Sequence, residues 1–344
     1  TRQTIYLVIR NLTIIFVTTL ITVHGQSKSS TTDSLDIVVP RFEKIEIKID
    51  GYLDESVWNS AASRSEFITY LPVDGRHADD DTEIRIWYSS TALYVGIIAQ
   101  EIHGEVRSTL ADRDKLDNED YVLLVLDTYN DKRTAYTFAV NPIGQQSDGT
   151  LTDNSSIGRN SFPFKVDDNP DYVFTSSGRL TKDGFVVEVE IPLKSLRFQS
   201  EDIQSWGFNV LRRVQHSGYW SSWSGARQGV ASFLAQGGTL VDMTELKREK
   251  VFDINPEIRG SLNRGPSPEK FGAETTDPLG LNLRYGLSSN VVMNATLNPD
   301  FSQIEADVAQ INYDPRRSLY FPEKRPFFLD GIELFSTCLL YTSD

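Results

Sequence analysis

Two tryptophans in a segment rich in serine and glycine are the first candidates for ligand-binding chemistry. The segment GYWSSWSG contains Trp220 and Trp223. An exposed indole can stack on the apolar face of a sugar ring, and aromatic side chains on loops are often exposed. The segment therefore predicts an aromatic ligand platform. The alternative is that one or both rings close the end of a hydrophobic core.

A sugar site also needs planar polar groups, because each polar group that loses its water must find a new partner. Arg212 and Arg133 carry guanidinium forks suited to neighbouring hydroxyls, and Tyr136 and Asn141 add further donors and acceptors. We predict that these four side chains bind a ligand. The alternative for Arg133, Tyr136 and Asn141 is that they tie a loop back onto a sheet.

An acidic segment, ADRDKLDNED, precedes a long apolar run. Carboxylate oxygens are the ligands that Ca²⁺ prefers, so Asp112, Asp114, Asp117 and Asp120 are candidate calcium ligands. Their spacing lacks the regular ligand loop of an EF-hand, and solvated charge is the alternative. The four histidines are scattered, so calcium is the one cofactor that the sequence suggests.

Catalytic motifs are not recognisable in the sequence. A glycosidase needs two carboxylates flanking one bond, and no motif singles out such a pair among 48 acidic residues. A nucleophile elbow, an HExxH motif and a phosphate loop are also missing. The sequence therefore favours a protein without enzymatic activity, and glycan hydrolysis is a third hypothesis. A formal net charge of -14 argues against a nucleic-acid partner, since phosphate binding needs a basic surface.

The elements that must position these residues are predicted to be β-strands. Between residues 36 and 246, TEIRIWYS alternates in polarity, whereas ALYVGIIAQE and DYVLLVLDT are apolar runs. Turn signals separate such segments at short intervals, which predicts an antiparallel β-sandwich. Eight residues are expected inside it: Trp58, Trp87, Val95, Ile97, Leu124, Leu126, Val187 and Val189.

The segment KIDGYLDESVWNSA predicts a strand-turn-helix unit at the start of this domain. Asp50-Gly51 has turn chemistry, and Asp54 stands where a helix N-cap belongs. Leu53, Val57 and Ala61 recur at helical spacing, so a short helix is expected to press Trp58 into the core. We therefore assign Trp58 a structural role.

The first 25 residues have the pattern of a secretory signal peptide, with an uncleaved anchor as the alternative. Arg2 and Arg10 precede the apolar run NLTIIFVTTLITV, and VHG at its end has the small or permissive residues that a signal peptidase reads. Residues 26–35 are expected to be a flexible leader. The protein is therefore expected to be exported.

After residue 246 the pattern changes. GLNLRYGLSSNVVMNATLN contains two strictly alternating segments joined by a polar turn. This pattern suits a membrane β-hairpin with lipid on one side, although a half-buried soluble hairpin gives the same alternation. Residues 337–344, TCLLYTSD, abandon the pattern and are interpreted as a non-native tail.

Several of these segments carry a family resemblance. IDGYLDESVW, TEIRIWYSSTALYVGI, DGFVVEVEIPLKSLRF and WGFNVLRR resemble, in order, the family 9 carbohydrate-binding module. NPDFSQIEADVAQINYDPRRSLYFPEKRPFFLDGIELF looks like the segment that opens the β-barrel of a bacterial outer-membrane family of uncharacterised function. The resemblance implies an all-β chain: a carbohydrate-binding-like sandwich at 36–246 and, at 247–336, the truncated beginning of an outer-membrane barrel.

The resemblance also implies a function and a place in the cell. A glycan or polysaccharide is the expected ligand, the barrel would contact outer-membrane lipid, and the sandwich would be periplasmic or surface-exposed in the cell envelope. A role in polysaccharide catabolism would fit. The alternative is a structural, docking or gating module that binds no sugar.

Three ligand positions depart from the family pattern. One stacking Trp is replaced around Leu116-Asp117-Asn118, a second falls near Ala231 or Ser232, and a sugar-binding Arg is replaced by Ala139. These departures are why the sequence points to Trp220 and Trp223 instead.

Overall fold

A computed structural model describes residues 35–102, 106–110, 113–116, 118–152, 166–168, 170–230, 232–247, 252–258, 263–264, 271–272, 279–286 and 292–298. The predicted signal peptide, nearly all of the leader and the predicted tail lie outside these residues. The described part of the chain holds no helix with the length and apolarity that crossing a membrane requires.

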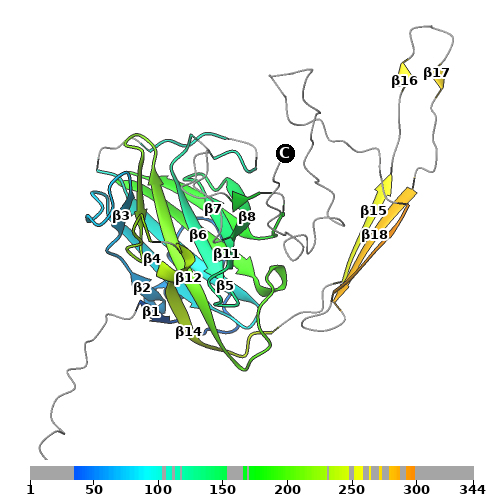
Figure 1. Ribbon diagram of the computed structural model, residues 1–344, viewed down its shortest axis with the longest axis horizontal. Coiled ribbons are helices and arrows are strands. Elements are labelled where there is room, and N and C mark those ends of the chain that lie inside the picture. The colour runs from blue at the N-terminus through cyan, green and yellow to red at the C-terminus, as the bar shows by residue number, and fades with distance from the viewer. Residues whose placement is uncertain are drawn as a thin grey trace, which may run out of the picture. The chain divides into compact units, whose positions relative to one another are not determined.

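The main body is a sandwich of two β-sheets (Figure 1), which confirms the predicted all-β sandwich. The larger sheet has nine strands in the order β1-β14-β12-β6-β7-β8-β9, and β13 joins β12 to β3. Its strands are β1 (Asp36–Val38), β3 (Ile68–Leu71), β6 (Tyr121–Asp127), β7 (Thr134–Val140), β8 (Gln146–Thr152), β9 (Val166–Asp167), β12 (Ile203–Val214), β13 (Tyr219–Ser222) and β14 (Gly238–Thr244).

The smaller sheet has five strands in the order β10-β11-β5-β4-β2. They are β2 (Ala62–Arg64), β4 (Thr82–Tyr88), β5 (Ala92–Gln100), β10 (Thr175–Thr181) and β11 (Gly184–Pro192). Three short 3-10 helices connect strands: η1 (Ser56–Ser60), η2 (Leu193–Ser195) and η3 (Leu234–Gln236). β1 runs parallel to β14, and the other described strands of the two sheets pair in antiparallel fashion.

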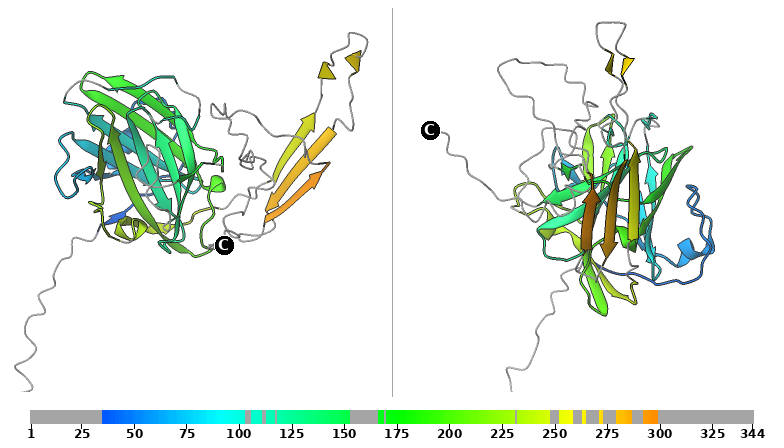
Figure 2. Two further views of the ribbon diagram at one scale, coloured as in Figure 1. Left: turned by 45° about the horizontal axis from the view of Figure 1, so that its top comes forward. Right: turned by 90° about the vertical axis from the view of Figure 1, so that its right-hand side faces the viewer.

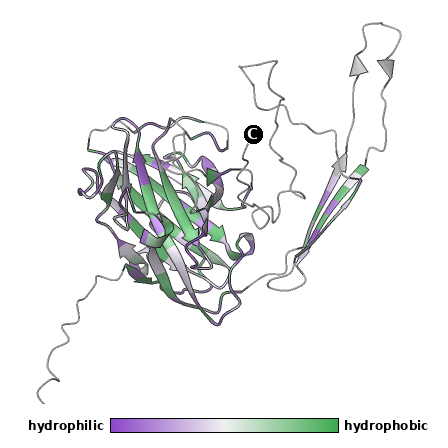
Figure 3. Cartoon of the chain, viewed as in Figure 1, coloured by the Kyte–Doolittle hydropathy of each residue, from purple (hydrophilic) through white to green (hydrophobic). Residues whose placement is uncertain are grey.

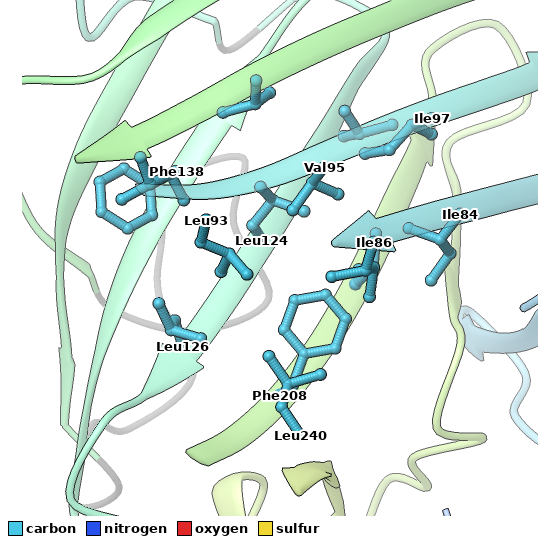
Figure 4. Packing of buried hydrophobic residues seen from close by; sticks show 14 of the residues in the cluster. Ile84, Ile86, Leu93, Val95, Ile97, Leu124, Leu126, Phe138, Phe208 and Leu240 are labelled. Carbon is cyan, nitrogen blue, oxygen red and sulfur yellow. The ribbon is translucent and has the colours of Figure 1, made fainter. Parts of the chain in front are cut away.

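The main hydrophobic core fills the space between the two sheets, where β5 and β4 face β6, β7 and β12 (Figure 4). Six of the eight predicted core residues lie there, all fully or almost fully buried: Val95, Ile97, Leu124, Leu126, Val187 and Val189. Apolar residues are concentrated in the strands of the sandwich (Figure 3). Burial on this scale is the main force that stabilises the fold.

Trp58 and Trp87 are buried as predicted, but in a different cluster. They lie on the outer face of the five-stranded sheet, with Val57, Ala92 and Tyr94. The rings of Trp87 and Tyr94 stack with centroids 3.9 Å apart. Alternation along β4 determines which residues share a face, but it does not show that a distant segment covers the outer one.

The predicted helix after Asp50-Gly51 is a 3-10 helix, η1, rather than an α-helix. Asp54 is not its N-cap: Glu55 holds that position, with no side-chain hydrogen bond to the helix. The turn itself forms as predicted, because Gly51 has a φ of 83° and Asp50 Oδ1 accepts from the Tyr52 amide at 3.1 Å.

The C-terminal strands form two small sheets. β15 (Phe252–Ile258), β18 (Leu279–Gly286) and β19 (Val292–Leu297) lie side by side in an antiparallel sheet (Figure 2), and β16 (Asn263–Arg264) pairs with β17 (Phe271–Gly272). The expected hairpin at 279–297 is therefore present.

Candidate functional site

Trp220 lies in a strand and is buried, with 4% of its surface exposed. β13 pairs with both β12 and β3, and Trp220 packs with Leu123 and Leu211 in the cluster on the outer face of the larger sheet. The ring of Tyr121 meets its indole edge to face at 5.4 Å, and the Arg213 guanidinium lies 5.9 Å from the indole centroid. These neighbours cover the ring that was expected to stack on sugar.

Trp223 is also buried, with 5% exposed, and it belongs to the core between the sheets. Its indole lies 6.0 Å from the Phe208 ring and closes over Gly238, where a Cβ would be 2.6 Å from Trp223 Cη2. The serines of GYWSSWSG suggested a loop, yet Ser222 is fully buried and bonds Asn209 Oδ1 at 3.1 Å. The burial of both tryptophans removes the physical basis on which they were chosen.

Arg212 points between the sheets instead of toward a ligand, with 1% of its side chain exposed. Its guanidinium donates to Thr82 Oγ1 at 3.0 Å and to the Gln100 carbonyl, and lies 3.7 Å from Glu101 Oε2. Burial lowers the pKa of Arg212, although the neighbouring acids oppose this shift. Arg212 therefore joins the two sheets at one end of the sandwich.

The other three residues that were predicted to bind a ligand are Arg133, Tyr136 and Asn141. Arg133 is exposed in the turn before β7. The Tyr136 hydroxyl accepts from the Arg197 amide at 3.0 Å, and Asn141 Oδ1 accepts from the amides of Ile143 and Gln145. Tyr136 and Asn141 thus make the loop-tying contacts of the alternative.

Carboxylates of the acidic segment accept hydrogen bonds from backbone amides. Asp114 Oδ1 accepts from the Asp148 amide at 3.2 Å, and Glu119 accepts from the Thr109 amide at 2.6 Å. Asp112 and Asp117 lie outside the described residues. Among the residues that are described, no three acidic, histidine or cysteine side chains come together as a metal site. The calcium site stays a prediction.

The positions where the family would bind sugar do converge, but they are filled with apolar groups. Leu116 and Ala139 belong to one buried cluster on the outer face of the larger sheet, which also contains Tyr121, Trp220 and Leu234. Ser232 is followed by Phe233, which packs against the same cluster; residue 231 is outside the described residues. The rings of Tyr121 and Trp220 on this face are buried.

An open pocket of about 630 Å³ lies between the connection that follows β5 and the turn that follows β12. It is lined by Val106, Arg107, Ser108, Gln215 and His216. Its volume is within the range of about 300–1,000 Å³ that is typical of small-molecule sites. No motif marks it in the sequence, because its walls come from the long connection between β5 and β6 and from the turn after β12.

Asp120 joins the two walls of the pocket. Its Oδ2 accepts from the Arg107 amide at 2.5 Å and its Oδ1 from the Gln215 amide at 2.9 Å. Burial raises the pKa of Asp120, while these hydrogen bonds lower it. The carboxylate that was predicted to hold calcium therefore fixes the spacing of the pocket.

The pocket presents hydrogen-bonding groups to the solvent over a charged second layer. Arg107, Ser108, Gln215 and His216 supply guanidinium, hydroxyl, amide and imidazole groups. Behind them, Glu101 Oε2 lies 3.9 Å from His216 Nδ1 and 3.7 Å from Arg212. Such a lining can pair with the hydroxyls of a small polar ligand.

The two packed sheets define the class of the domain as a β-sandwich. The chain belongs to the "Carbohydrate family 9 binding domain-like" family, whose model matches residues 49–228. Residues 261–343 match a second family, described as "Domain of unknown function (DUF5916)". No curated protein matches the chain.

Solved structures with a similar course of the chain have low identity. A family 9 carbohydrate-binding module from Caldicellulosiruptor kristjanssonii in complex with cellotriose is 16% identical, with a TM-score of 0.42, and covers 60% of this chain and 92% of its own. A family 9 carbohydrate-binding module from the same organism in complex with glucose is also 16% identical, with a TM-score of 0.42, and the match covers 60% of this chain and 94% of that chain. A putative carbohydrate-binding protein from Bacteroides uniformis is 14% identical, with a TM-score of 0.44, and the match covers 60% of this chain and 98% of that chain.

Proposed function

We propose that the sandwich binds carbohydrate. The observation that carries this proposal is the family membership of residues 49–228, which span most of the two-sheet body. The sequence departs from the family at the stacking positions, so the mode of binding must differ from one built on two exposed tryptophans. Family membership alone does not locate a site.

The pocket between Arg107 and Gln215 is the place that we propose for the sugar. It is open, it has the volume of a small-molecule site, and its lining is dominated by groups that bond hydroxyls. Asp120 holds its two walls by backbone hydrogen bonds, so the pocket is formed before a ligand arrives. A preformed site loses less free energy to ordering when it binds.

A glycan screen on the full chain tests the proposal. Glucose, cellotriose and xylan-derived oligosaccharides are suitable first probes, because two of them occur in the complexes of the similar structures. Binding to at least one glycan is expected. If the folded chain binds none of them, the proposal fails.

A docking or gating module without sugar affinity is the second candidate. It is favoured by the burial of Trp220 and Trp223 and by the filled outer face around Leu116 and Ala139. The same screen separates the two functions, since a docking module shows no glycan binding.

We further propose that the C-terminal strands begin an outer-membrane β-barrel, so that the exported protein is anchored in the cell envelope and serves polysaccharide catabolism. Register across β15, β18 and β19 supports the barrel: Ile254 pairs with Leu283, and Leu283 with Ala295. The opposite face carries Asn282 and Thr296, which bond at 2.7 Å. One apolar and one polar face is the pattern of lipid-facing strands.

A further inference from the structure

A buried carboxyl group lies on the outer face of the five-stranded sheet. Glu188 alternates with the core residues Val187 and Val189 along β11, so its side chain points away from the sandwich core, yet it is fully buried. The neighbouring position on β5 is Gly96, which has no side chain. A Cβ there would be 2.8 Å from Leu53 Cδ2, so Leu53 closes directly over the sheet beside Glu188.

The segment that covers Glu188 comprises residues 44–55, which we name the strap. Just before the strap, Phe42 donates its amide to the Tyr88 carbonyl at 2.9 Å, and just after it η1 leads into β2. The apolar residues Ile47, Ile49 and Leu53 pack on the cluster around Trp87. The strap contains no strand or helix of its own.

Carboxylates hold the backbone of the strap. Glu188 Oε2 accepts from the amides of Asp50 at 2.9 Å and Gly51 at 3.1 Å. Glu55 Oε1 accepts from the Lys48 amide at 3.3 Å. Glu188 Oε1 is buried and has no hydrogen-bond partner among the described residues. A charge on Glu188 would therefore be only half compensated in an apolar site.

The charged groups around Glu188 are mostly acids. Asp50 and Glu55 belong to the strap, and Lys48 pairs with Asp50 at 3.3 Å at the surface. From β10, Arg179 donates to the Gly51 carbonyl at 3.3 Å and stacks on the Tyr52 ring at 4.0 Å.

Three further elements face Glu188. β5 contributes Gly96, whereas η1 has no charged residue. On β11 itself, Glu190 accepts from the Tyr94 hydroxyl of β5 at 2.9 Å.

Burial sets the protonation of Glu188. Burial, the largest cause, raises the pKa of Glu188, and the nearby acids Glu55 and Asp50 raise it further. The hydrogen bonds from the two amides lower it, and the resulting pKa is about 7. If the strap lifts, Glu188 meets water and its pKa falls toward the ordinary value of about 4.3. The closed state therefore binds a proton that the open state releases between these two values.

We propose that the strap is a pH-sensitive cover: it lies closed while Glu188 is protonated and opens when Glu188 is ionised. The ratio of open to closed molecules rises about tenfold for each pH unit between the two pKa values and levels off above the higher one. Opening uncovers Leu53 and Trp58, and with them the stacked rings of Trp87 and Tyr94. This device is independent of the proposed sugar pocket.

Hydrogen exchange on the full chain from pH 5 to 8, corrected for the intrinsic exchange rate, tests the proposal. The protection of the Asp50 and Gly51 amides should fall by about tenfold for each pH unit up to about pH 7. The amides of Leu124 and Val125, in the middle of the larger sheet, serve as the reference for global unfolding and should not follow this course.

Two variants complete the test. In Glu188→Gln the protection of the strap should no longer depend on pH, whereas Glu190→Gln, on the same strand and the same face, should keep the wild-type dependence. Wild-type protection that does not change with pH would overturn the proposal even if Glu188→Gln failed to fold. A pH dependence that survives in Glu188→Gln, or disappears in Glu190→Gln, would also overturn it.

Discussion

The rings of Trp220 and Tyr121 meet edge to face, with centroids 5.4 Å apart and planes at 83°. They come from β13 and β6, which pair with opposite edges of β12, and Arg213 of β12 lies between them and contacts both rings. A sugar could stack on Trp220 only after this cluster had separated. The pair therefore stabilises the outer face of the larger sheet.

Replacing Trp220 with Ala is expected to destabilise the sandwich by about 3–5 kcal/mol, because it opens a cavity in a packed cluster. Molecules that remain folded should keep their glycan affinity. A denaturant titration and calorimetry measure the two effects. Loss of binding with unchanged stability would show that Trp220 is a ligand platform after all.

Replacing Arg212 with Met is expected to cost about 3–5 kcal/mol of unfolding free energy, since Glu101 would keep a buried charge without its cation. The double variant Arg212→Met/Glu101→Gln should recover part of the loss. A double-mutant cycle measures the coupling. Additive effects of the two substitutions would contradict the pairing.

Asp148 should give stability a pH dependence. Burial raises its pKa to about 6, although Arg113 and the Tyr172 amide lower it. The folded state then binds a proton that the unfolded state releases between about pH 4 and 6, so this contribution to stability falls as pH rises through that window. Asp148→Asn should lose this slope, which is at most about 1.4 kcal/mol per pH unit.

The control for Asp148 is Asp171→Asn. Asp171 faces the same Arg113 at 3.6 Å but is 78% exposed, so its neutralisation should leave the slope in place. Denaturant titrations at a series of pH values provide the comparison. Equal slopes in wild type and Asp148→Asn would refute the assignment.

The two faces of the C-terminal sheet should respond differently to charge. Leu281→Lys places a cation on the apolar face and should lower stability in lipid by up to about 2–4 kcal/mol, whereas Asn282→Lys, one residue on and on the polar face, should be tolerated. Residues 251–336 alone should aggregate or need detergent. A soluble, cooperatively unfolding product would contradict the barrel.

Much of the fold could be predicted from sequence because its strands are apolar runs with clear turns. Val95 and Leu124 illustrate this, since burial on the inner face follows directly from hydrophobicity. Trp58 was predicted to be buried, but its location under a strap depends on a contact between segments distant in sequence.

The site was harder to predict for a related reason. Residue type does not reveal where a side chain points. Arg212 could bind a ligand, yet its side chain points between the sheets and donates to Thr82 Oγ1. Ser and Gly suggested a loop at Trp220, where pairing with β12 makes a strand. Asp120 was singled out as a carboxylate next to a strand, but its hydrogen bonds to the amides of Arg107 and Gln215 could not be read from the sequence.

Calorimetry on the full chain with glucose, cellotriose and xylotriose tests the central claim, that the sandwich binds sugar in the pocket between Arg107 and Gln215. Wild type should bind at least one of them. Arg107→Gln and Gln215→Ala should weaken binding by about tenfold or more, because each removes a hydrogen-bonding group, while Arg227→Gln, an exposed arginine outside the pocket lining, should match wild type. No binding by the folded wild type, or binding that both pocket variants retain, would contradict the claim.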